Sequence, residues 1–326
     1  MRQVTVGQEI WPVRGVFRIA RGSSREIAVV VVEIREGQAV GRGECRPYAR
    51  YNETPQGVMA AIEAIVPDLS AGLDCKALNK RLPPGAARNA IDCALWDLAA
   101  KRAGQPVWKL AGLSSPQTLT TAFTLSVDSP ANLAEAARTQ AWRPLLKLKL
   151  AGKGDLERVA TVRANAPLAR LIVDANEAWS RADYESLAPE LARLGVEMLE
   201  QPFPTGADAC LATLPRPVAI CADESCHDTG SLDALSGLYD VVNIKLDKAG
   251  GLTEALRMRA RAEALGFAVM VGCMLGTSLA MAPALLVAQG VRYVDLDGPL
   301  LLAKDRQPGL RFEGSRICPP DGALWG

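Results

Sequence analysis

Short apolar runs that each end in a charged residue recur through the second half of the chain. Lys149 closes LLKLK, and Asp174, Glu200, Asp223 and Lys245 close the next four runs, each 22 to 26 residues after the one before. That spacing suits one strand, one helix and two short loops. We therefore predict alternating strands and helices, with eight strands near residues 118–124, 145–150, 170–174, 196–200, 218–223, 241–246, 268–273 and 292–297.

The first hundred residues have a different pattern. Residues 11–20 and 25–45 are rich in β-forming residues, and Glu36-Gly37 breaks the second stretch as a hairpin turn does. Thr54, followed by proline, is a typical helix start, with apolar residues at helical spacing after it. A second helix is predicted over 86–104, where the final glycine ends it. This mixture indicates an α+β unit.

The two patterns divide the chain into two domains. Residues 1–105 are predicted to form an α+β capping domain, and residues 106–302 an α/β domain, a (β/α)8 or TIM-like barrel. The tail, residues 303–326, contains no further strand–helix unit, and we expect it to return to the capping domain. In such a barrel the carboxyl ends of the strands face one shared space, which is where the active site lies.

Composition narrows the classes of function. A chain of 326 residues is long enough for a barrel and a smaller domain, and 49% hydrophobic residues supply a large core. A net charge of +1 without a Lys/Arg block argues against nucleic acid or an anionic membrane as a partner. No run of 18 apolar residues occurs, and the start, MRQVTVGQEIWPV, lacks a secretory-signal pattern. We expect a cytoplasmic protein.

The cysteine and histidine content removes several chemistries. The eight cysteines are scattered without a CxxC pair, so we expect them to be reduced and mostly buried. His227 is the only histidine and no GxSxG motif is present, which excludes histidine-rich zinc sites and argues against a Ser-His-Asp triad. Acid–base chemistry in this chain is therefore expected to use lysine and carboxylate groups.

Three of the strand-end charges are candidate metal ligands. Asp174, Glu200 and Asp223 offer oxygen donors only, which suits Mg²⁺, with Mn²⁺ as a substitute, better than zinc. The alternative is that each carboxylate pairs with a lysine or caps the following helix. Their position on successive strands, with lysines on both sides, favours the metal site.

The lysines are candidate bases. Lys147 and Lys149 are two residues apart in a strand and therefore point to the same face, while Lys245 lies on the sixth strand, across the barrel. A metal ion and a second lysine nearby can lower the pKa of a lysine enough for it to act as a base. Two bases on opposite sides of one carbon permit racemisation or epimerisation. Structural ion pairs to the same carboxylates are the alternative.

The motifs KLK, DAN, EQP, ADES and NIKLDKAGG, in this order, resemble the enolase superfamily in its muconate-lactonising-enzyme-like subgroup. The motifs GECRPYARY, AARNAIDCALWDLAA, VGCMLGTS and DLDGPL are similar to those of dipeptide epimerases. The resemblance implies a Mg²⁺ site, an acid/base pair and a residue that supports the enolate. It assigns these to Asp174, Glu200 and Asp223, to Lys149 and Lys245, and to Lys147, respectively.

The same resemblance implies a substrate. It predicts interconversion of L-Ala-L-Glu and L-Ala-D-Glu through an enediolate, in the salvage of cell-wall peptides, by a possible homo-oligomer. Other reactions on this scaffold remain open: N-acylamino-acid racemase, o-succinylbenzoate synthase and cycloisomerase, as does a non-catalytic binding protein. For the dipeptide substrate, the resemblance assigns the ammonium to Asp295 and Asp297 and the glutamate side chain to Arg21 or Arg25. Cys273 is a further substrate-binding residue. Asn176 and Glu224 are expected to support the lysines and the metal ligands.

Overall fold

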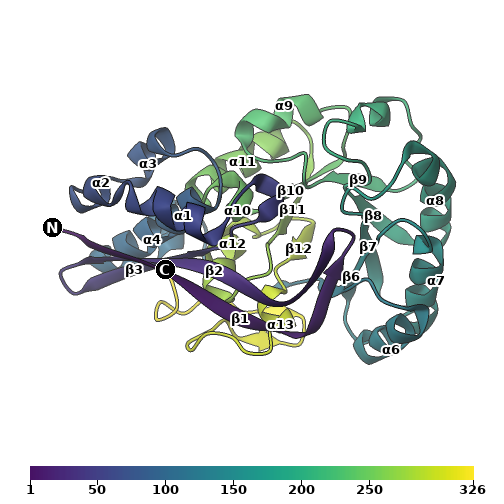
Figure 1. The fold of residues 1–326 in the computed structure, drawn as a ribbon, viewed down its shortest axis with the longest axis horizontal. Coiled ribbons are helices and arrows are strands. Elements are labelled where there is room, and N and C mark those ends of the chain that lie inside the picture. The colour runs from purple at the N-terminus through teal and green to yellow at the C-terminus, as the bar shows by residue number, and fades with distance from the viewer.

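Eight parallel strands form a nearly closed barrel in the computed structural model, which describes residues 1–326 (Figure 1). The strands are neighbours in chain order, and the backbone N–H of Ala122, beside the first strand, donates to the carbonyl of Val294 in the last strand at 2.8 Å. The strands are β5 (Phe123–Leu125), β6 (Leu145–Lys149), β7 (Arg170–Asp174), β8 (Val196–Glu200), β9 (Ala219–Ala222), β10 (Val241–Ile244), β11 (Ala268–Gly272) and β12 (Tyr293–Asp295). The predicted barrel is confirmed.

Helices connect the strands and cover the outside of the barrel (Figure 1). The third of them begins at a capping box, in which Ser180 and Asp183 each bond to the other's backbone N–H. Between β8 and β9 the connection contains only a short 3₁₀ helix. The segments are α6 (Pro130–Gln140), α7 (Asp155–Asn165), α8 (Arg181–Arg193), η2 (Asp208–Ala212), η3 (Thr229–Ser231), α9 (Leu232–Leu235), α10 (Leu246–Ala249), α11 (Leu252–Ala264), α12 (Ser278–Val287) and α13 (Gly298–Leu301).

A three-stranded antiparallel sheet packed against helices forms the N-terminal unit. Helix α4 approaches β3 so closely that a Cβ atom at Gly43 would lie 2.0 Å from the carbonyl oxygen of Ala90. The predicted helix start at Thr54 is confirmed, since its hydroxyl accepts from Gly57 N at 3.0 Å. The elements are β1 (Gln3–Ile19), β2 (Gly22–Glu36), β3 (Ala39–Cys45), η1 (Ala49–Tyr51), α1 (Pro55–Glu63), α2 (Val66–Ser70), α3 (Cys75–Arg81), α4 (Ala86–Ala103) and α5 (Val107–Leu110).

The first predicted barrel strand, 118–124, is partly wrong. Its first half is β4 (Leu119–Thr120), which pairs with β14 (Arg316–Ile317) in a small sheet completed by β13 (Phe312–Glu313). Only β5 belongs to the barrel. The last strand is also shorter than predicted, because it ends at Asp295 and the chain turns into α13.

The C-terminal tail crosses back over the N-terminal unit. Ala303 N donates to Pro12 O at 2.8 Å, the indole of Trp325 donates to Cys93 O at 3.0 Å, and Gly326 N donates to Asp97 at 2.7 Å. These contacts link the end of the chain to β1 and α4. The tip of the β1–β2 hairpin, meanwhile, reaches over the barrel near β6 and β7 (Figure 1).

The barrel interior is apolar at one end and charged at the other. Eight buried side chains, one from or directly before each strand, pack together in the interior: Ala122, Leu145, Ile172, Met198, Cys221, Val241, Met270 and Tyr293. Each lies before the carboxyl end of its strand, so this layer closes the barrel below the charged residues. No helix of the structure is both long enough and apolar enough to cross a membrane.

Candidate active site

Three carboxylates meet at the carboxyl ends of neighbouring strands. Asp174 and Glu200 are the last residues of β7 and β8, and Asp223 directly follows β9. One oxygen of each lies within 4.8 Å of the others, and none of the three residues exposes more than 2% of its surface. The structure therefore brings together the trio that the sequence analysis singled out.

Two lysines of β6 approach this trio from one side. Lys149 Nζ donates to Asp174 Oδ2 at 2.6 Å. Lys147 Nζ lies 2.6 Å from Glu200 Oε2 and 3.3 Å from the same Asp174 oxygen. Both side chains face the barrel interior, as alternation along a strand requires.

Two further lysines approach from the opposite side. Lys245, directly after β10, donates to Asp223 Oδ2 at 2.6 Å. Lys248, one helical turn later on α10, donates to Asp223 Oδ1 at 2.6 Å and to its backbone carbonyl at 2.5 Å. Lys248 was not predicted, and it fixes the orientation of the Asp223 carboxylate while leaving Lys245 at the cavity wall.

The charges in this cluster shift one another's pKa. Burial alone would lower the pKa of Lys147, but the surrounding carboxylates, that of Asp295 first, outweigh burial and hold this pKa well above its ordinary value. The pKa of Lys245 is raised in the same way, chiefly by Asp223. Both amines are therefore protonated while these carboxylates face them.

The trio fits a divalent cation. Burial, followed by the charge of Asp174, raises the pKa of Glu200 to about 7, which indicates that buried negative charge is in excess at this carboxylate. The donors are carboxylate oxygens without histidine or cysteine, a set that suits Mg²⁺ or Mn²⁺.

Amide side chains orient the carboxylates. Asn243 donates to Glu200 Oε1 at 2.7 Å, and the carbonyl oxygen of the Gln201 side chain accepts from Asp223 N at 2.9 Å. Gln201 adopts a positive φ of 34°, a strained conformation that the surrounding contacts must hold. Sequence reasoning missed both residues. The signal available for Gln201 was its place in the EQP motif.

Asn176 and Glu224 contact each other and the trio. The backbone N–H of Asn176 donates to Asp174 Oδ1 at 2.9 Å, and its side-chain amide lies 3.4 Å from Glu224 Oε1. Both residues are buried and line the cavity described below. Their predicted supporting role is compatible with this placement.

Asp295 and Asp297 lie at the end of β12, where both are buried. Asp295 Oδ2 accepts from Lys147 at 2.8 Å, whereas its other oxygen has no hydrogen-bond partner. Asp297 accepts from the backbone N–H of Thr124 at 2.6 Å, and burial together with the charge of Asp295 raises its pKa to about 7. Two neighbouring carboxylates thus share a site whose charge the chain does not fully neutralise.

A cavity of about 500 Å³ lies between the barrel and the N-terminal unit; Asp223 of the trio lines it, whereas Asp295 and Asp297 do not. Lys149, Lys245 and Cys273 line it from the barrel, and Tyr51 and Arg21 line it from the N-terminal unit. The volume is in the range of small-molecule sites.

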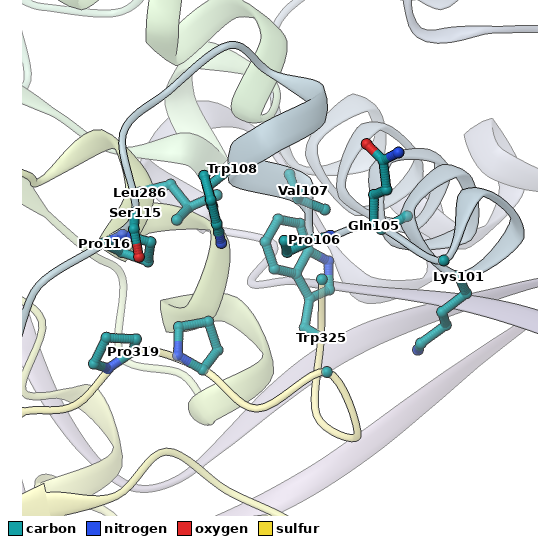
Figure 2. A pocket seen from close by; sticks show the side chains of 15 residues that line it. Lys101, Gln105, Pro106, Val107, Trp108, Ser115, Pro116, Leu286, Pro319 and Trp325 are labelled. Atoms are coloured by element: carbon teal, nitrogen blue, oxygen red, sulfur yellow. The ribbon is translucent and has the colours of Figure 1, made fainter.

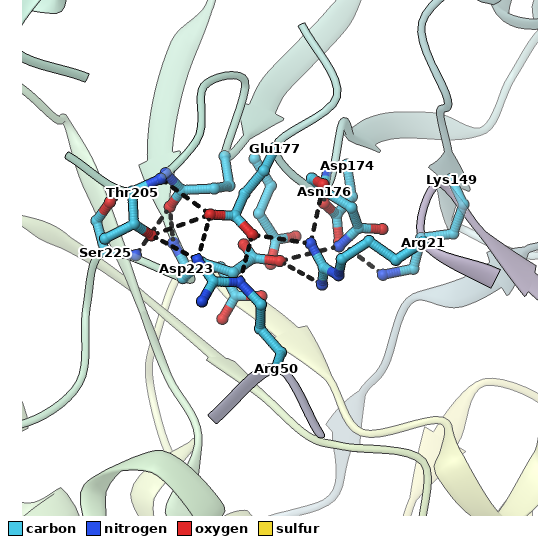
Figure 3. Close-up of polar contacts among 12 residues, drawn as sticks. Arg21, Arg50, Lys149, Asp174, Asn176, Glu177, Thr205, Asp223 and Ser225 are labelled. Atoms are coloured by element: carbon cyan, nitrogen blue, oxygen red, sulfur yellow. Dashed lines mark hydrogen bonds and ion pairs between the residues drawn. The ribbon is translucent and has the colours of Figure 1, made fainter. Parts of the chain in front are cut away.

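The predicted loop arginines have different surroundings. Arg21 donates to Glu224 at 2.7 Å, to Glu177 at 3.1 Å and to the carbonyl of Asn176 at 2.9 Å (Figure 3). Arg50 donates from Nε and Nη2 to the two carboxylate oxygens of Glu177, each at 2.7 Å (Figure 3). Arg25 is exposed on β2 and does not line the cavity.

A second cavity, of about 470 Å³, lies between α4, α5 and the tail (Figure 2). Prolines and tryptophans form much of its wall, including Pro106, Trp108, Pro319 and Trp325. Lys101 is its only lining residue with a charged side chain, and this lysine is paired with Asp97. Its wall contains no carboxylate, histidine or cysteine side chain that could pair with the lysine as an acid–base or metal site.

Two protein-family models match the chain. The model of the mandelate racemase/muconate lactonizing enzyme N-terminal domain matches residues 1–112, and the enolase C-terminal domain-like model matches residues 131–323.

Related proteins of similar length are epimerases and racemases. The L-Ala-D/L-Glu epimerase of Escherichia coli (strain K12) is 50% identical over 314 residues, which cover 96% of this chain and 98% of that protein. An N-acetyl-D-glutamate racemase of Pseudoalteromonas sp. is 43% identical over 300 residues, covering 91% of this chain and 95% of the relative.

Solved structures with the same fold contain dipeptides. An enolase family member from Agrobacterium tumefaciens with homology to dipeptide epimerases, with bound sodium and L-Ala-L-Glu, has a TM-score of 0.99 and 51% identity, with 100% of both chains covered. A dipeptide epimerase from Methylococcus capsulatus, complexed with Mg and L-Arg-D-Lys, has a TM-score of 0.87 and 32% identity, covering 98% of this chain and 97% of the other.

Proposed function

The chain belongs to the enolase superfamily, in the mandelate racemase/muconate lactonizing enzyme group, and we propose from this membership that it is a Mg²⁺-dependent dipeptide epimerase. It is an isomerase, as its relatives are. The substrates proposed are L-Ala-L-Glu and L-Ala-D-Glu, which differ only in the configuration of the second α-carbon.

The observation that carries this proposal is the pair of amines on opposite strands. Lys149 at the end of β6 and Lys245 after β10 both line the cavity, and each contacts a different carboxylate of the trio. One amine removes the α-proton from one face of the substrate, and the protonated amine opposite returns a proton to the other face. A protein that only bound its ligand would need no base on both sides.

Proton removal leaves a second negative charge on the substrate carboxylate. We assign the stabilisation of this growing charge to Lys147, a buried amine that contacts both Asp295 and Glu200. Asp174, Glu200 and Asp223 would hold the metal ion. When bound, Mg²⁺ supplies positive charge that stabilises the enediolate and lowers the pKa of the neighbouring lysines.

The dipeptide's free ammonium is assigned to Asp295 and Asp297. Support comes from their burial at the end of the last strand and from the unpaired oxygen of Asp295. With the reacting α-carbon between Lys149 and Lys245, the N-terminal residue of the dipeptide extends toward this pair. Cys273 lines the same cavity and is proposed as a contact.

A second candidate is an N-acylamino-acid racemase, favoured by the 43% identity to an N-acetyl-D-glutamate racemase. Such a substrate carries no ammonium, so two buried carboxylates at its acyl end would be costly. The Asp295/Asp297 pair therefore favours the dipeptide.

The experiment that tests the proposal uses a dipeptide library in D₂O with Mg²⁺, read by mass gain at the α-carbon. Deuterium in L-Ala-L-Glu, and not in N-acetylglutamate, supports the epimerase. The reverse pattern selects the racemase, and deuterium in neither overturns both.

The cellular setting is part of the same proposal. We assign the enzyme to the cytoplasm, to the recycling of peptidoglycan peptides and to a homo-oligomeric assembly, with Mn²⁺ able to replace Mg²⁺. Residues 1–105 with the tail 303–326 act as the capping domain, and residues 106–302 carry the chemistry.

A further inference from the structure

Three arginines of the N-terminal unit line the active-site cavity, and one of them has no carboxylate partner. Arg21 is paired with Glu224 and Glu177, and Arg50 with Glu177. Arg46 forms no ion pair within 4.0 Å, although it is half-buried in the cavity wall. Its guanidinium lies 5.8 Å from the centre of the Tyr48 ring, so Arg46 has an aromatic neighbour but no carboxylate partner.

The contacts of Arg46 fix its position in the cavity wall. It directly follows β3, and its backbone N–H donates to Asp247 Oδ1 at 3.0 Å, two residues after Lys245. Its guanidinium donates from Nη1 to the carbonyl of Leu275 at 3.2 Å, two residues after Cys273. Arg46 therefore bridges the segments that follow β10 and β11, in the wall of the cavity that Lys245 also lines, with most of its guanidinium donors unassigned.

The carboxylates nearest to Arg46 are engaged elsewhere. Asp247 Oδ1 also accepts from Asn89 at 2.9 Å, and burial raises the pKa of Asp247 to about 7, so that its negative charge is only partial near neutrality. Glu44 is held by Arg306 at 2.7 Å, and the Glu53 carboxylate accepts two backbone N–H groups. Burial lowers the pKa of Arg46, as expected for a cation that lacks a close counter-ion.

Removing a guanidinium from water costs free energy unless an anion pairs with it. From these contacts we infer that Arg46 determines specificity by binding the anionic side chain of the substrate's C-terminal residue. The inference rests on the proposed function and names the residue that selects the acidic side chain of its substrates. Arg21, which faces two carboxylates already, is less able to receive a third.

The test compares one substrate pair across matched variants. The ratio of kcat/KM for L-Ala-L-Glu over L-Ala-L-Gln isolates the side-chain charge, because the two dipeptides have nearly the same shape. Arg46→Gln keeps a donor for Leu275 O but removes the charge, and should lower this ratio by about 10- to 150-fold, mainly through the KM of L-Ala-L-Glu. Arg46→Lys keeps the charge but loses the two-pronged geometry, and should give an intermediate ratio.

Two control variants separate the roles of other arginines. Arg35→Gln removes an exposed charge from β2 and should leave the ratio unchanged. Arg21→Gln tests the loop arginine favoured from the sequence. If Arg21→Gln lowers the ratio and Arg46→Gln does not, the inference is overturned.

Failure of the inference differs from failure of the proposed function. If wild-type enzyme isomerises neither dipeptide, the proposed function fails. If wild type is active and Arg46→Gln lowers both kcat/KM values equally, along with its melting temperature, Arg46 is only a packing residue. Should Arg46→Gln not fold, Arg46→Lys decides, because an unchanged ratio in that variant would count against the inference.

Discussion

The Nζ atom of Lys245 lies 2.6 Å from Oδ2 of Asp223, on the side of the carboxylate trio opposite to Lys149. Lys149 makes the corresponding contact with Asp174, also at 2.6 Å. The two amines therefore have equivalent partners on the two sides of one site. This symmetry is what a reaction that runs in both stereochemical directions requires.

The first prediction concerns these two lysines. Lys149→Ala and Lys245→Ala should each abolish epimerisation, because each leaves a base on only one face. Each variant should still exchange the α-proton of one stereoisomer with D₂O, and the isomers should differ. Proton NMR of L-Ala-L-Glu and L-Ala-D-Glu in D₂O measures this directly. Exchange of the same isomer by both variants would refute the opposed-base arrangement.

The second prediction concerns the metal. Chelation should abolish activity, and Mg²⁺ or Mn²⁺ should restore it. Because a ligand that binds only the folded state stabilises it, Mg²⁺ at 100 times its Kd should add about 2.7 kcal/mol to the free energy of unfolding. Asp223→Asn should reduce this gain more than it reduces the stability of the metal-free protein. Glu190→Gln serves as the control, because this partly exposed carboxylate of α8 pairs with Arg193 and not with the trio. Full activity of a protein shown to contain no metal would end the proposal.

The third prediction concerns the ammonium site. N-acetylation of L-Ala-L-Glu should lower kcat/KM by at least about tenfold, because a charge-assisted contact contributes about 1.5–3 kcal/mol. Asp297→Asn should remove much of this discrimination. If free and N-acetylated dipeptides react equally well with wild type, Asp295 and Asp297 do not bind an ammonium. The result would then favour the N-acylamino-acid racemase.

The fourth prediction concerns pH. The pKa of Asp297 is raised from 3.8 to about 7, so below pH 7 the carboxyl is increasingly neutral and unable to pair with an ammonium. The kcat/KM for free L-Ala-L-Glu should therefore fall as the pH drops through 7. The Asp297→Asn variant should not show this fall, because it has no carboxyl group at position 297.

Stability should change in the opposite direction. Because the pKa of Asp297 is raised in the folded state, its contribution to the free energy of unfolding is fully present below about pH 4 and is lost as the pH rises through 7. Thermal unfolding of wild type and Asp297→Asn between pH 5 and 8 measures the difference. A stability gap that does not widen with pH would show that Asp297 is ionised throughout.

Most of the barrel could be predicted because its strands are buried on both faces and appear as continuous apolar runs. The strand ending in Asp174 spans 170–174 as predicted, and β10 ends two residues earlier than predicted. The segment 118–124 was misassigned because the partner of Leu119–Thr120 is Arg316–Ile317, almost two hundred residues away. A local pattern indicates that a segment is extended but not which strand it joins.

Site residues at the ends of strands could be predicted from the sequence. Site residues whose contacts depend on the path of a connecting segment could not. Asp174 and Lys245 follow from their position after apolar runs. The contact of Lys248 with Asp223 depends on how α10 turns after β10, and the contact of Arg46 with Leu275 depends on how two units dock. Neither relationship leaves a periodic signal in the sequence.

The measurement that tests the central claim most directly follows L-Ala-L-Glu and L-Ala-D-Glu separately in D₂O with Mg²⁺, by mass spectrometry and chiral separation. Two opposed amines that exchange protons with solvent predict that each dipeptide yields its epimer carrying a single deuterium at the α-carbon of the glutamate. Inversion without deuterium, or no inversion of either dipeptide while both lysines and bound metal are intact, would contradict the account.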